Sequence, residues 1–149
     1  MEKIERFEVT FSSLLPVFSK RIEKWKPPRL KSEIAYRDEL LSCLRKIVPE
    51  DVRVEKEYRH RGTTIDIWIG WKGYLFDDEL AIEIKHNLNK KTDFDRLVGQ
   101  IEGLDPKENK ILVALIGETD PALIGRLKGK YSEMIKTDEP KVAIIQVNV

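Results

Sequence analysis

The stretch that decides the fold runs from Thr63 to His86 and reads TTIDIWIGWKGYLFDDELAIEIKH. Residues 63–70 and 80–86 each alternate between aliphatic and other side chains, which is the pattern of a β-strand with one buried face. Gly73 and the aromatic residues after it indicate a turn near 73–76, so the two strands form a hairpin. The predicted core face of this hairpin carries Thr63, Ile65, Ile67, Ile69, Leu80, Ile82 and Ile84.

The opposite face of the hairpin carries Asp66, Glu83 and Lys85. A register that pairs Asp66 with Glu83 places Tyr74 and Leu75 at the tip of the turn. Opposed carboxylates would have their Cβ atoms about 5 Å apart and would repel each other. Lys85, on the diagonal, offsets part of this repulsion, and a divalent cation would offset more of it.

Hard oxygen ligands suit Mg²⁺ (or Mn²⁺), and here they would come from Asp66, Glu83 and the backbone carbonyl of Ile84. Lys85 follows Glu83 by two residues and therefore points to the same side of the strand. It could orient or deprotonate an attacking water and stabilise charge that develops on a phosphate. These residues favour phosphodiester hydrolysis. The alternative interpretation is a solvated strand face with a cross-strand ion pair.

The rest of the chain alternates helices and strands. Apolar spacing predicts a helical run over 2–25 that Pro16 interrupts, followed by a stiff connector over 26–29. Ser32 is the predicted cap of the next helix. The expected elements are then a helix over 32–47, strands over 52–58, 63–70 and 80–86, a helix over 93–103, a strand over 110–116, a helix over 120–135 and a strand over 141–147. This order implies an α/β fold with a mixed sheet flanked by helices.

The order of Glu39, Asp66 and the tripeptide Glu83-Ile84-Lys85 resembles the PD-(D/E)XK nuclease superfamily, whose core is helix, three strands, helix, strand. The resemblance covers residues 32–116. It implies a restriction-endonuclease-like fold in which 1–28 is an N-terminal helical extension and 117–149 a helix-strand extension. Ile65 stands where the family has a proline before the first acid.

The resemblance also implies roles for two residues on the flanking helices. The run Arg37-Asp38-Glu39-Leu40-Leu41 is similar to the first helix of archaeal Holliday-junction resolvases, and it makes Glu39 a metal-supporting residue. Glu33 is its competitor on the same helix. Gln100 matches the glutamine of the Gln-x-x-x-Tyr motif of RecB-like members, although Leu104 replaces the tyrosine. A surface glutamate and a surface amide are the alternative interpretations.

The formal net charge is +1, so any phosphate binding has to come from a local patch of cations. Two basic clusters flank the proposed centre in the sequence and could contact the DNA backbone. These predicted DNA-binding residues are Arg59, Arg61, Lys90 and Lys91.

Several classes of protein are disfavoured. One cysteine excludes an internal disulfide and a cysteine-rich zinc module, and there is no Gly-x-x-x-x-Gly-Lys-Ser/Thr run for ATP. No segment approaches the roughly 20 apolar residues that span a membrane, and the N-terminus lacks the apolar core of a signal peptide. We therefore expect a soluble, intracellular (cytoplasmic) protein without membrane contact.

The sequence predicts a metal-dependent endodeoxyribonuclease that cuts DNA with Mg²⁺ (or Mn²⁺). A Holliday-junction resolvase is one alternative, and a non-catalytic DNA-binding or protein-interaction module on the same fold is another. Because such nucleases often act on both strands, and because the N-terminal segment is rich in Phe and Trp, we also expect a homodimer.

Overall fold

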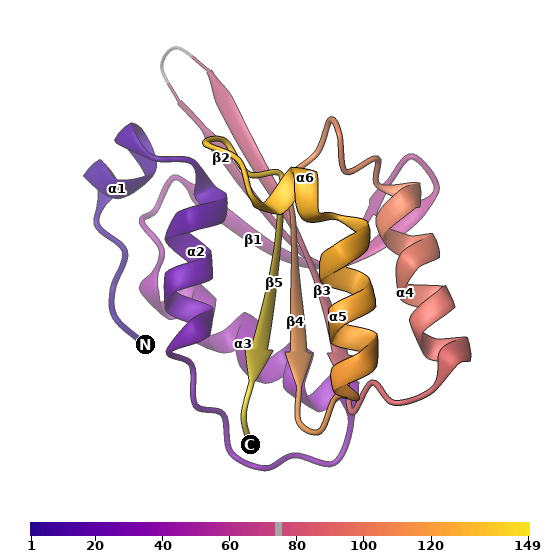
Figure 1. The fold of residues 1–149 in the computed structure, drawn as a ribbon. Helices are drawn as coiled ribbons and strands as arrows, with labels where there is room; N and C mark the ends of the chain where they lie inside the picture. Colours follow the sequence, from indigo (N-terminus) through magenta and orange to yellow (C-terminus); the bar gives the residue numbers. More distant parts are fainter. Residues whose placement is uncertain (74–75) are drawn as a thin grey trace.

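The computed structural model describes residues 1–73 and 76–149, and Figure 1 shows their fold. Helices and strands alternate along the chain after an N-terminal helical segment. The elements are α1 (Arg6–Phe11), α2 (Leu14–Glu23), α3 (Glu33–Ile47), β1 (Val52–His60), β2 (Thr63–Lys72), β3 (Asp77–His86), α4 (Lys91–Gly103), β4 (Ile111–Ile116), α5 (Pro121–Lys130), α6 (Ser132–Ile135) and β5 (Val142–Val147).

The strands form a five-stranded sheet in the order β1-β2-β3-β4-β5. The first three strands are antiparallel neighbours, whereas β4 runs parallel to β3 and β5 runs parallel to β4. The predicted α/β class with a mixed sheet flanked by helices is confirmed. Residues 117–149 add their strand to the same sheet, beside β4.

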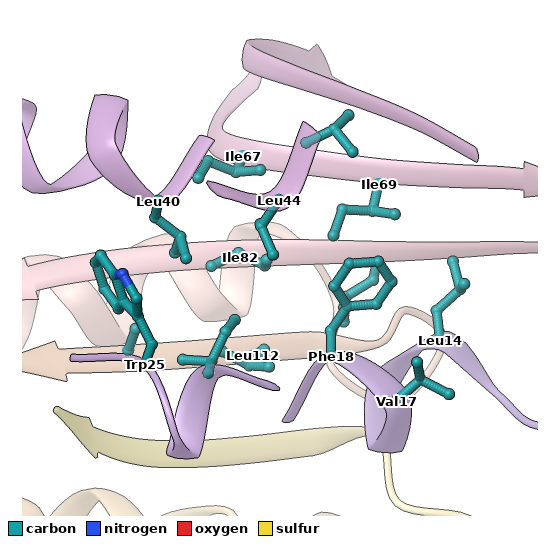
Figure 2. Close-up of a cluster of buried hydrophobic side chains, with 14 of the residues drawn as sticks. Leu14, Val17, Phe18, Trp25, Leu40, Leu44, Ile67, Ile69, Ile82 and Leu112 are labelled. Carbon is teal, nitrogen blue, oxygen red and sulfur yellow. The ribbon is translucent and has the colours of Figure 1, made fainter. Parts of the chain in front are cut away.

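Helices α2 and α3 cover one face of the sheet and bury the larger of two apolar cores. The β2–β3 hairpin contributes to this core five of the aliphatic residues that the alternation predicted, Ile67, Ile69, Leu80, Ile82 and Ile84. In Figure 2, Leu14, Val17, Phe18 and Trp25 from α2 and the segment after it, with Leu40 and Leu44 from α3, meet Ile67, Ile69, Ile82 and Leu112 of the sheet.

The other face of the sheet is covered by α4 and α5, which carry the two crossovers between parallel strands. On α4, the side chains of Phe94, Leu97 and Ile101 are buried against the sheet, and Val98 is half-buried. All six residues of β4 are buried, because this central strand has helices on both faces.

The boundaries of the helices differ from the prediction at two places. The N-terminal run breaks at Ser12 and Ser13, and Pro16 lies in the first turn of α2, where a proline costs no helical hydrogen bond. The helix expected over 120–135 is interrupted at Tyr131, which separates α5 from α6. The hairpin strands extend further toward the turn than predicted, to Lys72 and back to Asp77.

The hairpin register is the predicted one, because Ile67 pairs with Ile82 and Lys72 with Asp77. The predicted tip residues, Tyr74 and Leu75, lie outside the described residues. The prediction of one continuous core face is wrong at Ile65, which packs into the core beneath α4 and α5 rather than with Ile67. The alternation of β2 is therefore broken at Asp66.

In the part of the chain that the structure describes, no helix combines the length and the apolar character needed to cross a bilayer.

Candidate active site

Asp66 lies where the regular pairing of β2 stops. The β1–β2 ladder pairs Ile65 and Ile67 but passes over Asp66, and the β2–β3 ladder begins only at Ile67. The Asp66 carboxylate instead accepts a hydrogen bond of 2.8 Å from the backbone N–H of Ile84. This bond holds the carboxylate against the β3 backbone beside Glu83, in the gap where the two strands diverge.

Glu83 is fully buried, with no exposed surface. Neither of its carboxylate oxygens has a hydrogen-bond partner among the described residues. A buried polar group without a partner costs about 1–3 kcal/mol, and more when it is charged, so folded proteins rarely keep one without a use for it. The Glu83 carboxyl group thus lies beside Asp66 without a hydrogen bond of ordinary geometry, which makes its oxygens candidate ligands.

The electrostatics of this pair follow from its geometry. Burial, together with the negative charge of Asp66, raises the pKa of Glu83 to about 9, and the positive charge of Lys85 opposes this rise. Glu83 therefore carries a proton at neutral pH when nothing else neutralises it. A bound cation would take the place of that proton.

Lys85 completes the group and is itself nearly buried, with 11% of its side chain exposed. Its Nζ lies 3.8 Å from a carboxylate oxygen of Glu33, at the first turn of α3. The other Glu33 oxygen accepts a hydrogen bond of 3.3 Å from the backbone N–H of His86. Ser32 fixes the start of this helix, because its hydroxyl accepts a hydrogen bond from the Ala35 N–H, as predicted.

The helical acid that reaches the site is thus Glu33, whereas Glu39 was the predicted one. The side-chain contact of Glu39 is with Cys43 on its own helix, with Sγ and Oε1 3.7 Å apart. Six residues at about 100° each place Glu39 some 120° around the helix axis from Glu33. The two glutamates therefore face different directions, and only the earlier one lies over the ends of the strands.

Gln100 of α4 was the predicted site residue on the second covering helix. Its amide oxygen is buried and has no hydrogen-bond partner among the described residues. This distinguishes Gln100 from a solvated surface amide, but no contact joins it to Asp66 or Lys85. The predicted ligand Ile84 contributes its N–H to Asp66 and is fully buried.

The carboxylates of Asp66 and Glu83 are ligands of the type that divalent cations bind, although they are only two side chains. Within residues 1–73 and 76–149, no three His, Cys, Asp or Glu side chains cluster closely enough to enclose a metal ion. Two converging carboxylates, one of them without any partner, nonetheless fit an ion such as Mg²⁺, which binds through one or two carboxylates and keeps several waters.

The predicted DNA-binding cations are exposed on both sides of this centre. Arg59 and Arg61 lie at the β1–β2 turn, and Lys90 and Lys91 lie at the start of α4. Lys91 pairs with Asp95 at 2.9 Å, an exposed pair that a phosphate could compete with.

One nearby ion pair was not anticipated. Glu57 occupies the position on β1 that the register sets opposite Asp66, and it has a positive φ of 51°. Its carboxylate receives a hydrogen bond of 2.8 Å from Arg37 of α3. Glu57 and Arg37 both belong to charge-rich segments of the sequence. Nothing in those segments predicts that the backbone of β1 becomes irregular at Glu57.

No protein-family model, no curated protein and no solved structure matches this chain. The assignment of a function therefore depends on the arrangement of the side chains themselves.

Proposed function

We propose that this chain is a metal-dependent endodeoxyribonuclease of the PD-(D/E)XK kind, with a restriction-endonuclease-like fold. The observation that carries the proposal is the convergence of Asp66, unpartnered Glu83 and Lys85 at the point where β2 and β3 separate. Two acids and an ammonium group around one gap are the groups needed to hold a cation and act on a phosphodiester.

The order of the elements supports this proposal. A helix, three antiparallel strands, a crossover helix and a strand parallel to the third appear in sequence as α3, β1–β3, α4 and β4. This is the core order that the resemblance implies. The site also lies toward the carboxyl end of β3, at the edge of the sheet where ligands of open α/β sheets bind.

Each residue has a role that follows from its surroundings. Asp66 and Glu83 would hold Mg²⁺ or Mn²⁺, which when bound would polarise the phosphodiester and make water acidic enough to attack it. Lys85 lies close enough to lower the pKa of Glu83, so it can orient the attacking water and neutralise charge on the phosphate. Glu33 positions Lys85 through their ion pair and does not need to touch the substrate.

DNA would contact the exposed cations on either side of the site. Arg59 and Arg61 lie beyond one end of α4, and Lys90 and Lys91 lie at its other end. A helix of 13 residues is about 20 Å long, so the two clusters are spaced to contact separate stretches of backbone. Such contacts position the substrate without reading its sequence.

We further propose that the chain acts as a homodimer. Phe7 and Phe11 follow one another by a helical turn on α1 and are 63% and 84% exposed, and Phe76 is 60% exposed. Phe11 and Phe76 also line one cavity of about 470 Å³. Sedimentation at micromolar concentration should give a dimer that Phe11→Ser weakens, whereas a monomeric wild type would refute this proposal.

Cleavage assays test the nuclease proposal directly. Linear duplex, single strands and a four-way junction are incubated with Mg²⁺, Mn²⁺ or EDTA. We expect cleavage that requires the metal and falls by about 1,000-fold in Glu83→Ala and Lys85→Ala, since both groups act on the reacting centre.

Glu79→Ala and Lys72→Ala are the matched controls, because both residues are exposed in the same two strands. They should retain activity within about twofold. Metal-dependent cutting that survives Glu83→Ala and Lys85→Ala would refute the site. DNA retention without cutting under every condition would instead indicate a binding module, and strong preference for the junction would indicate a resolvase.

A further inference from the structure

The structure has a second feature beside the candidate site, a cavity of about 370 Å³ at the carboxyl ends of the parallel strands. It lies next to the site, because Glu33 contacts residues of both: its carboxylate is 3.8 Å from Lys85 Nζ and accepts a hydrogen bond of 3.3 Å from the N–H of His86, which lines the cavity. The cavity is lined by Arg29, Leu30, Tyr36, His86, Asn87, Gly117, Glu118, Asn148 and Val149.

The walls of this cavity are fixed by specific contacts. The fully buried Tyr36 packs its ring against His86, with centroids 4.8 Å apart, and its hydroxyl accepts a hydrogen bond from the Leu30 N–H. This bond ties the connector before α3 to the strand ends. Next to His86, the Asn87 side-chain oxygen accepts a hydrogen bond of 2.8 Å from the Glu118 N–H, which leaves the amide N–H₂ of Asn87 to donate to a ligand.

A glycine at position 117 allows the turn after β4 to lie close to Asn87. It has a φ of +83°, and a Cβ at this position would lie only 2.3 Å from the Asn87 side-chain oxygen. The close approach keeps the turn after β4 tight against the loop after β3. The two loops therefore hold the Asn87 side chain and the His86 ring in place next to Gly117.

The chemistry of the lining fits one nucleotide. Arg29 is exposed, and the ion pairs within the described residues all involve other side chains, so its guanidinium is available for a phosphate. The half-buried His86 offers a ring on which a base can stack, and the amides of Asn87 and Asn148 can bond to a base edge. The carboxylate of Glu118 would repel a phosphate near it, so the phosphate of the nucleotide would lie beside Arg29.

We infer that this cavity takes up a single unpaired nucleotide of the DNA next to the phosphodiester that is cut. This inference rests on the proposed function and names the substrate class within it. Pockets that hold small ligands start at roughly 300 Å³, so one nucleotide fits but a stacked base pair does not. A base must leave the helix stack to enter, which is easiest where it is already unpaired. The enzyme therefore prefers DNA with an unpaired nucleotide beside the cleavage position.

The test uses duplexes that contain 2-aminopurine, a base whose fluorescence rises when it unstacks. One set is fully paired and the other carries a single unpaired 2-aminopurine. Fluorescence is measured with the protein in EDTA, so that this readout does not require catalysis, and cleavage is measured separately with Mg²⁺ or Mn²⁺.

The protein should bind the unpaired set about tenfold more tightly and cut it about tenfold faster, with a change in fluorescence when the base enters the cavity. Arg29→Ala and His86→Ala should abolish this preference in the EDTA measurement. Lys31→Ala is the matched control, since Lys31 is an exposed cation two residues from Arg29 that does not line the cavity, and it should keep the preference.

Equal binding and equal cutting of the two sets would overturn the inference while leaving the nuclease proposal intact. A preference that Lys31→Ala removes as strongly as Arg29→Ala would also overturn it, because the effect would then come from general charge. Tight binding of the unpaired set without any cleavage would support the nucleotide cavity and refute the nuclease.

Discussion

Strand β3 has two buried carboxyl groups, and they differ in their hydrogen bonding. Asp78, at the start of the strand, accepts hydrogen bonds from the Leu14 N–H at 2.8 Å and from Lys110 Nζ at 2.6 Å. Glu83, five residues later, has no partner for either oxygen. Both side chains are removed from water, at 8% and 0% exposure. The difference separates an acid whose oxygens are satisfied within the fold from one whose oxygens have no partner among the described residues.

The same contrast applies to the backbone around them. Near Asp78 the β2–β3 ladder is continuous from Ile67–Ile82 to Lys72–Asp77. Near Glu83 the ladder has ended, and a backbone N–H is bonded to the Asp66 side chain. The hairpin is therefore paired and hydrogen-bonded around Asp78, whereas around Glu83 the strand pairing has ended and a buried carboxyl group has no hydrogen-bond partner among the described residues.

Substitution of Asp78, whose carboxylate is fully hydrogen-bonded, should have the largest effect on stability. Asp78→Ala leaves Lys110 partly buried without its partner and removes the acceptor for the first N–H of α2. We expect the free energy of unfolding to fall by about 3 kcal/mol, as measured by urea denaturation. The folded variant should keep its activity. An unchanged stability would show that the Asp78 contacts are not formed in solution.

Substitution of Glu83, at the end of the hairpin where the strand pairing has stopped, should instead stabilise the protein. A carboxyl group with a raised pKa in the folded state contributes stability below its unfolded pKa, near 4.5, and loses it as the pH rises toward 9. Glu83→Gln removes this loss. In EDTA at pH 8 the variant should be more stable than the wild type, and the difference should vanish below pH 4.5.

Thermal denaturation across this pH range measures the effect, and added Mg²⁺ provides an internal check. If Glu83 is the metal ligand that we propose, the cation should stabilise the wild type but have little effect on Glu83→Gln, because it would bind the folded state through this carboxylate. A variant that is less stable than the wild type at pH 8 would mean that Glu83 is satisfied in solution.

The smallest expected effect compares the two glutamates of α3. Glu33→Gln removes the ion pair with Lys85 and should lower the rate of cleavage about tenfold, whereas Glu39→Gln should change it by less than about twofold. The reverse ranking would restore Glu39 as the helical acid.

The pattern of apolar residues was sufficient to predict the strands and the mixed sheet, because period-two alternation puts Ile67, Ile69, Leu80 and Ile82 on one buried face. It allowed the observed hairpin register without requiring it, since a slip of two residues keeps the same side chains on that face. The departure of Ile65 could not be predicted, since it depends on the turn of the backbone at Glu57 on the adjacent strand. Periodicity describes a regular strand and contains no information about where the regularity ends.

The candidate site was predicted in part for a similar reason. Asp66, Glu83 and Lys85 are close in one hairpin, so local alternation brings them together. Glu33 and Glu39 lie on a helix whose rotation about its own axis is set by contacts such as Tyr36 with His86, 50 positions along the chain. Likewise, the partners of Asp78 are 64 and 32 residues away, and only the folded chain identifies them.

The strand order has a consequence for how the chain reaches its folded state. Every strand lies next to its neighbours in sequence, and none is inserted between two strands formed earlier. The sheet can therefore grow from β1 toward β5 by addition at one edge, including during synthesis from the N-terminus. The short loops between β1, β2 and β3 can close first, and the two longer crossovers through α4 and α5 follow. Each step then costs little conformational entropy of the chain, which favours rapid folding.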